Sequence, residues 1–182
     1  AMQRSYTLAE YQRVLDRIRE RIPGVAVTTD IIVGFPGETD ADFQATHEFM
    51  RHARFDGAFL FKYSARPDTR AFKLTETVDD AEKGRRLAEL LEQQQQISAG
   101  IHDGYLGREV EVLVDGPSFP ARSAYPPQLH GKSREFKTVV WADDGTAPGT
   151  LSRVRVVGAT PVTLLGESVN VPRAEPLLTI GG

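Results

Sequence analysis

A short run of three β-branched residues, Ile31 to Val33, restricts the fold of this chain more than any other feature. The run has no polar alternation, which is typical of a parallel strand buried on both faces. It leads into residues 34–39, reading GFPGET, where glycines allow unusual backbone conformations and proline ends the strand. Thr39 is a predicted helix N-cap, with Asp42 in the capping-box position. The stretch therefore predicts a strand, a turn and a helix, and α/β proteins bind ligands at such turns.

The GFPGET turn leaves two interpretations open, a structural β–α connection or a ligand-binding loop, because a fold by itself does not define a function. A phosphate-binding loop is a weaker third interpretation. The turn has two glycines but no lysine, so it matches neither of the two common glycine-rich phosphate-binding patterns.

Residues 1–104 alternate between helical and strand patterns. Three helices are predicted, over about residues 7–22, 40–54 and 79–102. The first begins with a Thr7–Glu10 capping box, and the last carries Gln93 to Gln96 as an exposed stretch. A second apolar run, Ala58 to Tyr63, predicts another buried strand. This order is typical of a βα barrel or of a doubly wound sheet, but two strands cannot close a sheet. We therefore expect either an incomplete βα (TIM-like) barrel segment of a larger domain or a half that finds its sheet partners elsewhere.

A polar loop, Tyr63 to Thr69, follows the second predicted strand. Its Arg66 has a planar guanidinium that suits a carboxylate or a phosphate, and loops at this end of a sheet often carry function. Arg66 could equally pair with Asp68 or cap a helix end. Both interpretations stay open.

From about residue 105 the hydrophobic period changes to two, as in Val110, Val112 and Val114. Strands are predicted near residues 108–115, 119–125, 135–142, 151–157 and 162–169. Five short strands in about 65 residues indicate a small antiparallel OB-like barrel. We expect this all-β domain to span residues 105–171 and a tail to span residues 172–182.

The predicted barrel carries basic residues that are candidates for RNA binding. They are Arg122, His130, Lys132, Arg134, Lys137, Arg153 and Arg155. Tyr125, Phe136 and Trp141 are available for base stacking or for the core, and Trp141 is more typical of a core residue. Basic residues also occupy the outer positions of ordinary barrels, so RNA binding and a plain solvated surface both stay open.

The composition excludes several classes of protein. The chain has no cysteine, which excludes disulfides, thiolate catalysis and cysteine-ligated metal or iron–sulfur sites within it. Its net charge of -3 excludes binding of nucleic acid through overall positive charge. No apolar run approaches the roughly 20 residues of a membrane span, and the first residues do not form a signal peptide. We expect a cytoplasmic protein with no membrane partner. His47 and His52 lack further metal ligands at suitable spacing.

Two stretches and their order suggest a family. TDIIVGFPGET, then FLFKYSARPDTRA, then a long helix and an all-β module ending in ATPVTLLGES resemble the carboxyl-terminal half of the radical S-adenosylmethionine methylthiotransferases. The resemblance runs from Met2 to about Ser168. YSARPDT and GKSREFKTVVW are similar to the MiaB-type, tRNA-modifying branch. The resemblance implies the end of a radical S-adenosylmethionine barrel followed by an RNA-binding TRAM domain.

The resemblance also implies an activity for a longer parent enzyme, the addition of a methylthio group to C2 of isopentenyladenosine next to the tRNA anticodon. Such a parent uses S-adenosylmethionine and two [4Fe-4S] clusters. The cysteines that hold those clusters are absent here, so the chain is expected to be a fragment that is inactive alone and binds no cofactor. Its expected partners are tRNA, through the anticodon stem-loop, and a second copy that pairs or exchanges across the open barrel edge.

Site residues follow from the resemblance residue by residue. Asp30, Ile32 and Gly34 match the fifth barrel strand, and Phe61 and Tyr63 match the sixth, all on the adenine side of the S-adenosylmethionine pocket. Arg66 would face the substrate adenosine or its phosphate. The acidic residue of the general pattern falls one place late, at Glu38, whose role stays open. No catalytic or metal-binding residue is expected.

Two other functions stay open beside this one. The first is a fragment of the branch that modifies a ribosomal protein, with the barrel contacting protein. The second is a self-sufficient RNA-binding protein whose α/β half is only a scaffold. Exposed apolar strand edges in the α/β half would favour the fragment.

Overall fold

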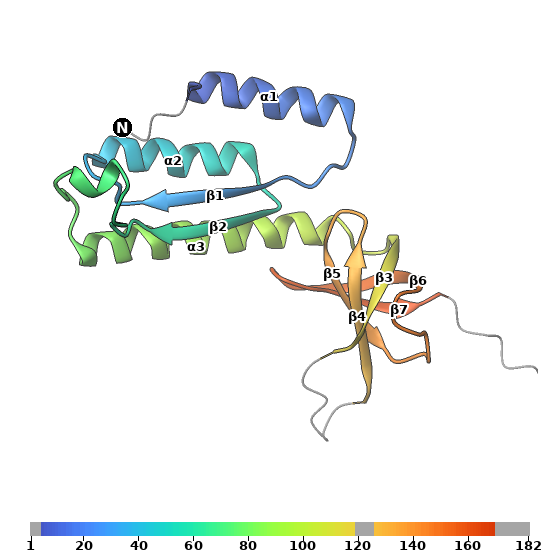
Figure 1. Ribbon diagram of the computed structural model, residues 1–182. Helices are drawn as coiled ribbons and strands as arrows, with labels where there is room; N and C mark the ends of the chain where they lie inside the picture. Colours follow the sequence, from blue (N-terminus) through green and yellow to red (C-terminus); the bar gives the residue numbers. More distant parts are fainter. Residues whose placement is uncertain (1–4, 119–125, 170–182) are drawn as a thin grey trace, which may run out of the picture. The chain divides into compact units, whose positions relative to one another are not determined.

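The computed structural model describes residues 5–118 and 126–169. The chain divides into two compact units, residues 1–104 and residues 105–182 (Figure 1). In its described residues, the first unit contains three α-helices, a short 3-10 helix and two strands, and the second contains five strands. Among the described residues, no helix combines the length and the apolar character needed to cross a membrane.

The first unit follows the predicted order of helices and strands. Its elements are α1 (Leu8–Arg21), β1 (Thr28–Val33), α2 (Asp40–Ala53), β2 (Gly57–Lys62), the short 3-10 helix η1 (Ala71–Lys73) and α3 (Asp80–Asp103). Both predicted capping boxes are confirmed, at Thr7 with Glu10 and at Thr39 with Asp42. These local side-chain bonds satisfy backbone N–H groups that the first turn of a helix leaves free.

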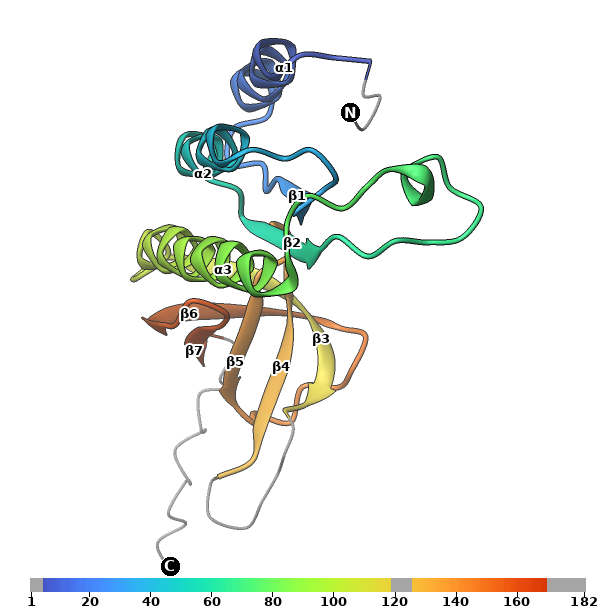
Figure 2. The ribbon, with the colours of Figure 1, turned by 90° about the vertical axis from the view of Figure 1, so that its left-hand side faces the viewer.

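Helices α2 and α3 pack on one face of a two-stranded parallel sheet, and α1 lies beside α2 (Figure 2). One cluster of buried side chains joins the sheet to α2 and α3, through Val33, Phe43, Met50 and Leu90. A second cluster, Leu15, Ala53 and Phe55, holds α1 against α2 and the start of β2. All of the apolar packing of β1 and β2 is therefore directed to one side.

The opposite face of the sheet is exposed, and this corrects the prediction that both strands are buried on both faces. Ile32 is 42% exposed, Phe59 is 61% exposed and Phe61 is 52% exposed. Because strand side chains alternate between faces, Asp30 and Ile32 lie on this side opposite Phe59 and Phe61. The apolar runs predicted strands that are buried on both faces of the sheet, but the described residues cover only one of the two faces.

The glutamine run of α3 is a second correction. Gln93 and Gln94 are each 8% exposed, while Gln95 and Gln96 are exposed, so only the second half of the run matches the prediction. The Gln93 amide donates to the carbonyl of His47 at 3.0 Å, and the Gln94 amide donates to the carbonyl of Phe55 at 2.9 Å. They are buried because they face α2 and the segment after it, where they satisfy backbone carbonyls.

The second unit is a closed five-stranded barrel. Its strands are β3 (Glu109–Pro117), β4 (Gln128–Ser133), β5 (Thr138–Ala142), β6 (Leu151–Ala159) and β7 (Leu164–Ser168), in the order β3-β4-β5-β7-β6. The small OB-like barrel is confirmed, except that β5 and β7 pair in parallel and the barrel is therefore mixed. The strand predicted at 119–125 lies outside the described residues, as does the tail. The strand β4 was not predicted.

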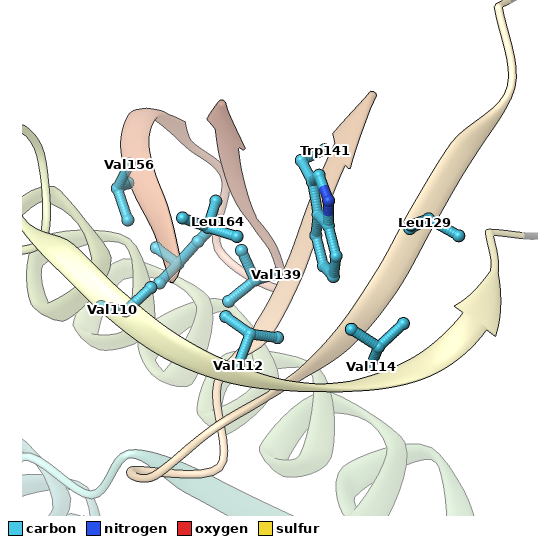
Figure 3. Close-up of a cluster of buried hydrophobic side chains, with 9 residues drawn as sticks. Val110, Val112, Val114, Leu129, Val139, Trp141, Val156 and Leu164 are labelled. Carbon is cyan, nitrogen blue, oxygen red and sulfur yellow. The ribbon is translucent and has the colours of Figure 1, made fainter. Parts of the chain in front are cut away.

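The barrel is filled by alternating side chains from all five strands (Figure 3). Trp141 is 1% exposed and lies in this core, as its size predicts. Gly131 on β4 has a specific role in the packing, since an added Cβ would collide with the backbone oxygen of Leu113 on β3. The glycine lets the two strands approach closely where the barrel closes.

Candidate functional site

A hollow of about 530 Å³ lies in the first unit, against the open face of the sheet and the loop after β2. Five of its lining residues were predicted as site residues, namely Asp30, Ile32, Phe61, Tyr63 and Arg66. The parallel pairing of β1 and β2 places Ile32 directly opposite Phe61. The structure therefore brings residues that are 29 positions apart to one site at the carboxyl ends of two strands.

Phe35 is a lining residue that the sequence did not single out. Its ring meets that of Tyr63 edge to face, with centroids 5.2 Å apart and an interplanar angle of 70°. Such a pair is a favourable aromatic arrangement. The available signal was the aromatic residue inside GFPGET, directly after the first glycine. With Ile32 and Phe61, the two rings give the hollow an apolar wall.

Two charged groups of the hollow, Asp30 and Arg66, are available for binding. In the described part of the chain, the side chains of Asp30 and Arg66 have no hydrogen-bond or ion-pair partner, so Arg66 does not pair with Asp68. Lys62 is engaged, with its ammonium 2.8 Å from the carboxylate of Asp80. The hydrogen bond from Lys62 is the main cause that lowers the pKa of Asp80. One carboxylate and one guanidinium are thus left beside the apolar wall.

Gly34 lies next to the hollow but does not line it. Its φ of +72° is in the left-handed region, and an added Cβ would collide with the side chain of Lys83. Lys83 is 4% exposed. Its ammonium lies 2.5 Å from Glu76 and 5.5 Å from the centroid of the Tyr63 ring. The absence of a side chain at Gly34 therefore leaves room for the buried side chain of Lys83, which packs against the turn.

Glu38, whose role the sequence left open, stabilises the conformation of the GFPGET turn. One carboxylate oxygen accepts hydrogen bonds from the N–H groups of Gly34 at 2.8 Å and of Phe35 at 3.4 Å. The other oxygen lies 2.6 Å from the guanidinium of Arg86, which is 3% exposed. Arg86 also binds Asp40 and Glu82. Burial opposes the charge of Arg86, but the hydrogen bonds that it donates to Glu82 and Glu38 outweigh burial and raise its pKa.

The residues described by the structure offer no metal site. No three His, Asp or Glu side chains among them come together as ligands. The Nδ1 of His47 lies 3.5 Å from the amide nitrogen of Gln93, and its Nε2 lies 3.8 Å from a carboxylate oxygen of Glu89. His52 is exposed.

Three basic residues of the barrel lie next to acidic residues of β3. Arg134 binds Glu111 at 2.7 Å and Arg155 binds Glu109 at 2.8 Å, while exposed Arg153 lies opposite Glu111 in the register of β3 and β6. Acidic residues of β3 thus balance much of the positive charge on this face. A cation paired in this way has to exchange its carboxylate for a phosphate.

Three further candidates lie on β4 or in the hairpin that follows it. Lys132 donates to the hydroxyl of Thr138 at 2.7 Å and lies 4.9 Å from the centroid of the Phe136 ring. His130 is half-buried, and its Nδ1 has no partner among the described residues. Lys137 is only 5% exposed, so it does not present its side chain on the surface. Arg122 and Tyr125 lie outside the described residues.

Comparison with known proteins gives a consistent result. No family model matches the chain. It is 41% identical over 169 residues to the tRNA-2-methylthio-N(6)-dimethylallyladenosine synthase of Alkaliphilus oremlandii, covering 93% of this chain and 35% of that protein. The synthase of the same name from Chlorobium chlorochromatii is 45% identical over 167 residues, with coverages of 91% and 36%. The chain therefore spans about a third of the length of these curated relatives.

A partial α/β unit with a hollow at its strand ends, accompanied by a small β-barrel, is the arrangement that the motifs predicted for a methylthiotransferase. The similarity to the synthases confirms that resemblance. The chain belongs to the methylthiotransferase family and is related to its tRNA-modifying members.

Proposed function

We propose that this chain is the carboxyl-terminal portion of a tRNA methylthiotransferase, which adds a methylthio group to C2 of isopentenyladenosine beside the anticodon. In this proposal residues 1–104 contribute one wall of the S-adenosylmethionine pocket, and the barrel, a TRAM domain, binds the anticodon stem-loop. The observation that carries the proposal is the single hollow shared by Asp30, Ile32, Phe61, Tyr63 and Arg66. The names of the curated relatives support the substrate class.

The residues of the hollow fit the adenosine part of S-adenosylmethionine. Ile32, Phe35 and Phe61 offer apolar and aromatic surface to a flat purine, and the free carboxylate of Asp30 can accept hydrogen bonds from sugar hydroxyls. Arg66 is available for a carboxylate or a phosphate. When bound, S-adenosylmethionine supplies the radical chemistry of the parent enzyme. The residues of this chain orient the cofactor and keep water from one side of it.

The chain does not fit the iron–sulfur clusters, because it contains no cysteine to ligate them. We therefore assign no step of the reaction to this chain and expect it to be inactive alone. The clusters would belong to the remaining two thirds of the parent.

The exposed face of the sheet supports a longer parent over a self-sufficient RNA-binding protein. Ile32, Phe59 and Phe61 together present apolar surface on two neighbouring strands. Clustered apolar groups of this kind usually pack against another element. In the parent, S-adenosylmethionine would cover Ile32 and Phe61, and further barrel strands would enclose the rest of this face. In the isolated chain, a second copy is the alternative cover.

A binding titration tests the proposed role of the barrel. The probe is a labelled anticodon stem-loop RNA, titrated with the 182-residue chain at two salt concentrations. Charge reversal at Lys132, Arg134 and Arg153 should weaken binding and flatten its salt dependence, since each lost phosphate contact lowers the slope by about 1. Lys137 is left intact because it is buried.

Arg51→Glu provides the matched control. Arg51 is a surface arginine of α2, paired with Glu48 at 3.0 Å, and it lies in the other unit. Equal loss of binding in Arg51→Glu and the barrel variant would contradict a specific role of the barrel. Failure of the folded chain to bind the stem-loop at low salt would contradict RNA recognition by this portion of the enzyme. A protein substrate, as in the branch that modifies a ribosomal protein, would then be favoured.

A further inference from the structure

The hairpin between β4 and β5 holds an aromatic residue in a conformation that suits glycine. The N–H of Phe136 donates to the carbonyl of Ser133 at 2.9 Å, and the N–H of Ser133 donates to the carbonyl of Lys137 at 2.9 Å. Phe136 has a φ of +59°, in the left-handed region. A hairpin of this kind places a turn before one left-handed residue, normally glycine or asparagine. A bulky side chain at this position is a strained choice.

Burial does not compensate for that strain. The Phe136 residue is 74% exposed, whereas the barrel core is built by other side chains, Trp141 among them. An exposed side chain gains little from packing, so Phe136 contributes nothing evident to the stability of the hairpin. Strained residues that have no stabilising role are concentrated at functional sites.

The ring lies beside one cation. The ammonium of Lys132 is 4.9 Å from the ring centroid, within the range of a cation–π contact. A second cation, Arg134, belongs to the same hairpin; its side chain is 77% exposed and pairs with Glu111. The carboxylate of Glu135 accepts a hydrogen bond from the Ser133 hydroxyl at 3.0 Å. An open aromatic ring next to the Lys132 ammonium matches the two parts of a nucleotide, a flat base and an anionic phosphate.

We propose that Phe136 is a stacking platform for one unpaired RNA base, with Lys132 orienting the ring and lying close to the adjacent phosphate. This inference rests on the proposed binding of RNA by the barrel and names the base contact within it. Trp141 cannot take this part because it is buried in the core. Phe136 is therefore the exposed aromatic residue of the described barrel that is best placed for stacking.

The test compares Phe136→Asn with the wild-type chain, using the labelled anticodon stem-loop and a fully paired duplex of the same length. Stacking on an aromatic side chain is worth about 1–3 kcal/mol per base, so affinity for the stem-loop should fall about 5-fold or more. The salt dependence should stay unchanged because no charge is removed. Affinity for the duplex should not change. Phe136→Tyr keeps a ring and should retain binding.

The same variant gives a second, opposite readout. Asparagine tolerates the left-handed conformation better than phenylalanine, so the melting temperature of the barrel should rise by about 4 °C or more in Phe136→Asn. Trp141 is the only tryptophan, so its fluorescence reports the barrel. Val162→Asn is the matched control, because Val162 is an equally exposed apolar residue, at 73%, in another turn of the barrel. It should alter neither binding nor the melting temperature in this way.

Abasic substitution locates the base. If each loop base of the stem-loop is removed in turn, one position should weaken binding to the wild-type chain but not to Phe136→Asn, because both changes delete the same contact. Equal affinity of Phe136→Asn and wild type, together with lost binding on charge reversal, would overturn the stacking inference and leave the proposed function intact. Absence of binding by the wild-type chain would overturn both.

Discussion

The carboxylate of Glu38 bridges two parts of the first unit, accepting the N–H of Gly34 at 2.8 Å and lying 2.6 Å from the guanidinium of Arg86. It thereby fixes the turn that carries Phe35 into the wall of the hollow. Arg86 comes from α3, so the shape of the turn depends on the packing of that helix against α2 and the sheet.

Substitution of Glu38 should destabilise the first unit alone. Glu38→Ala leaves the buried Arg86 short of one carboxylate and frees the N–H of Gly34, at a cost of about 2 kcal/mol. Far-UV circular dichroism reports this unit because all three α-helices belong to it, while Trp141 fluorescence reports the barrel. The denaturation midpoint should fall when it is followed by circular dichroism and stay unchanged when it is followed by Trp141 fluorescence. Asp40→Asn, at a side chain that is 88% exposed, should cost less than about 1 kcal/mol.

A methyl group at Gly131 should destabilise the barrel. Its Cβ would meet the backbone oxygen of Leu113, which cannot move without separating β3 from β4. Gly131→Ala should therefore lower the free energy of unfolding of the barrel by about 2 kcal/mol or more. Urea denaturation followed by Trp141 fluorescence measures this change. Gly84→Ala is the contrasting substitution, since nothing lies within 4 Å of its Cβ position in α3. That change should stabilise the first unit by up to about 1 kcal/mol. Equal effects in both variants would contradict the packing described for Gly131.

The ion pairs of Glu82 predict a pH dependence of stability. Hydrogen bonds from Arg85 and then from Arg86 lower the pKa of Glu82 from 4.5 to about 2. A carboxylate whose pKa is lower in the folded state stabilises the fold above its unfolded pKa. This contribution should therefore be complete above about pH 4.5 and be lost as the pH falls to about 2. The stability difference between wild type and Glu82→Gln, followed by circular dichroism, should shrink across that window.

The open face of the sheet predicts how the isolated chain associates. Phe59 is 61% exposed, so Phe59→Ser should change the stability of the folded unit by only about 0.5 kcal/mol or less. Removing the ring should also reduce self-association, measured by light scattering across a range of concentrations. A larger loss of stability that depends on protein concentration would instead show that a second copy covers this face.

The burial of Lys137 predicts which basic residues can be changed without unfolding the barrel. Lys137→Glu places a reversed charge at a position that is 5% exposed, so it should lower stability by about 2 kcal/mol or more. Arg153→Glu, at an exposed position, should leave the melting temperature nearly unchanged. Trp141 fluorescence during thermal unfolding compares the two. Equal melting temperatures would place Lys137 on the surface.

Local interactions could be predicted from the sequence because their partners lie within one helical turn. Thr39 and Asp42 form their capping box three residues apart, and the spacing of Phe43, Met50 and Ala53 identified the buried face of α2. The two motifs also identified residues of the hollow, Asp30 and Tyr63 among them. Residue type and spacing were sufficient for the capping box and the helix face, whereas the residues of the hollow followed from the resemblance of the two motifs to a known family.

Other features depend on contacts between distant segments, and only the tertiary structure decided them. Ile32 and Phe61 are apolar residues, and their type does not tell whether another layer covers them. Their exposure is known only because the structure shows that the helices pack on the other face of the sheet. Gln94 is buried because the carbonyl of Phe55 lies within reach, 39 residues away. Of the aromatic residues in the described barrel, strand alternation directed Trp141 inward, whereas a left-handed turn left Phe136 in solvent. Composition and period determine what a segment can form, but burial is a property of the whole packed unit.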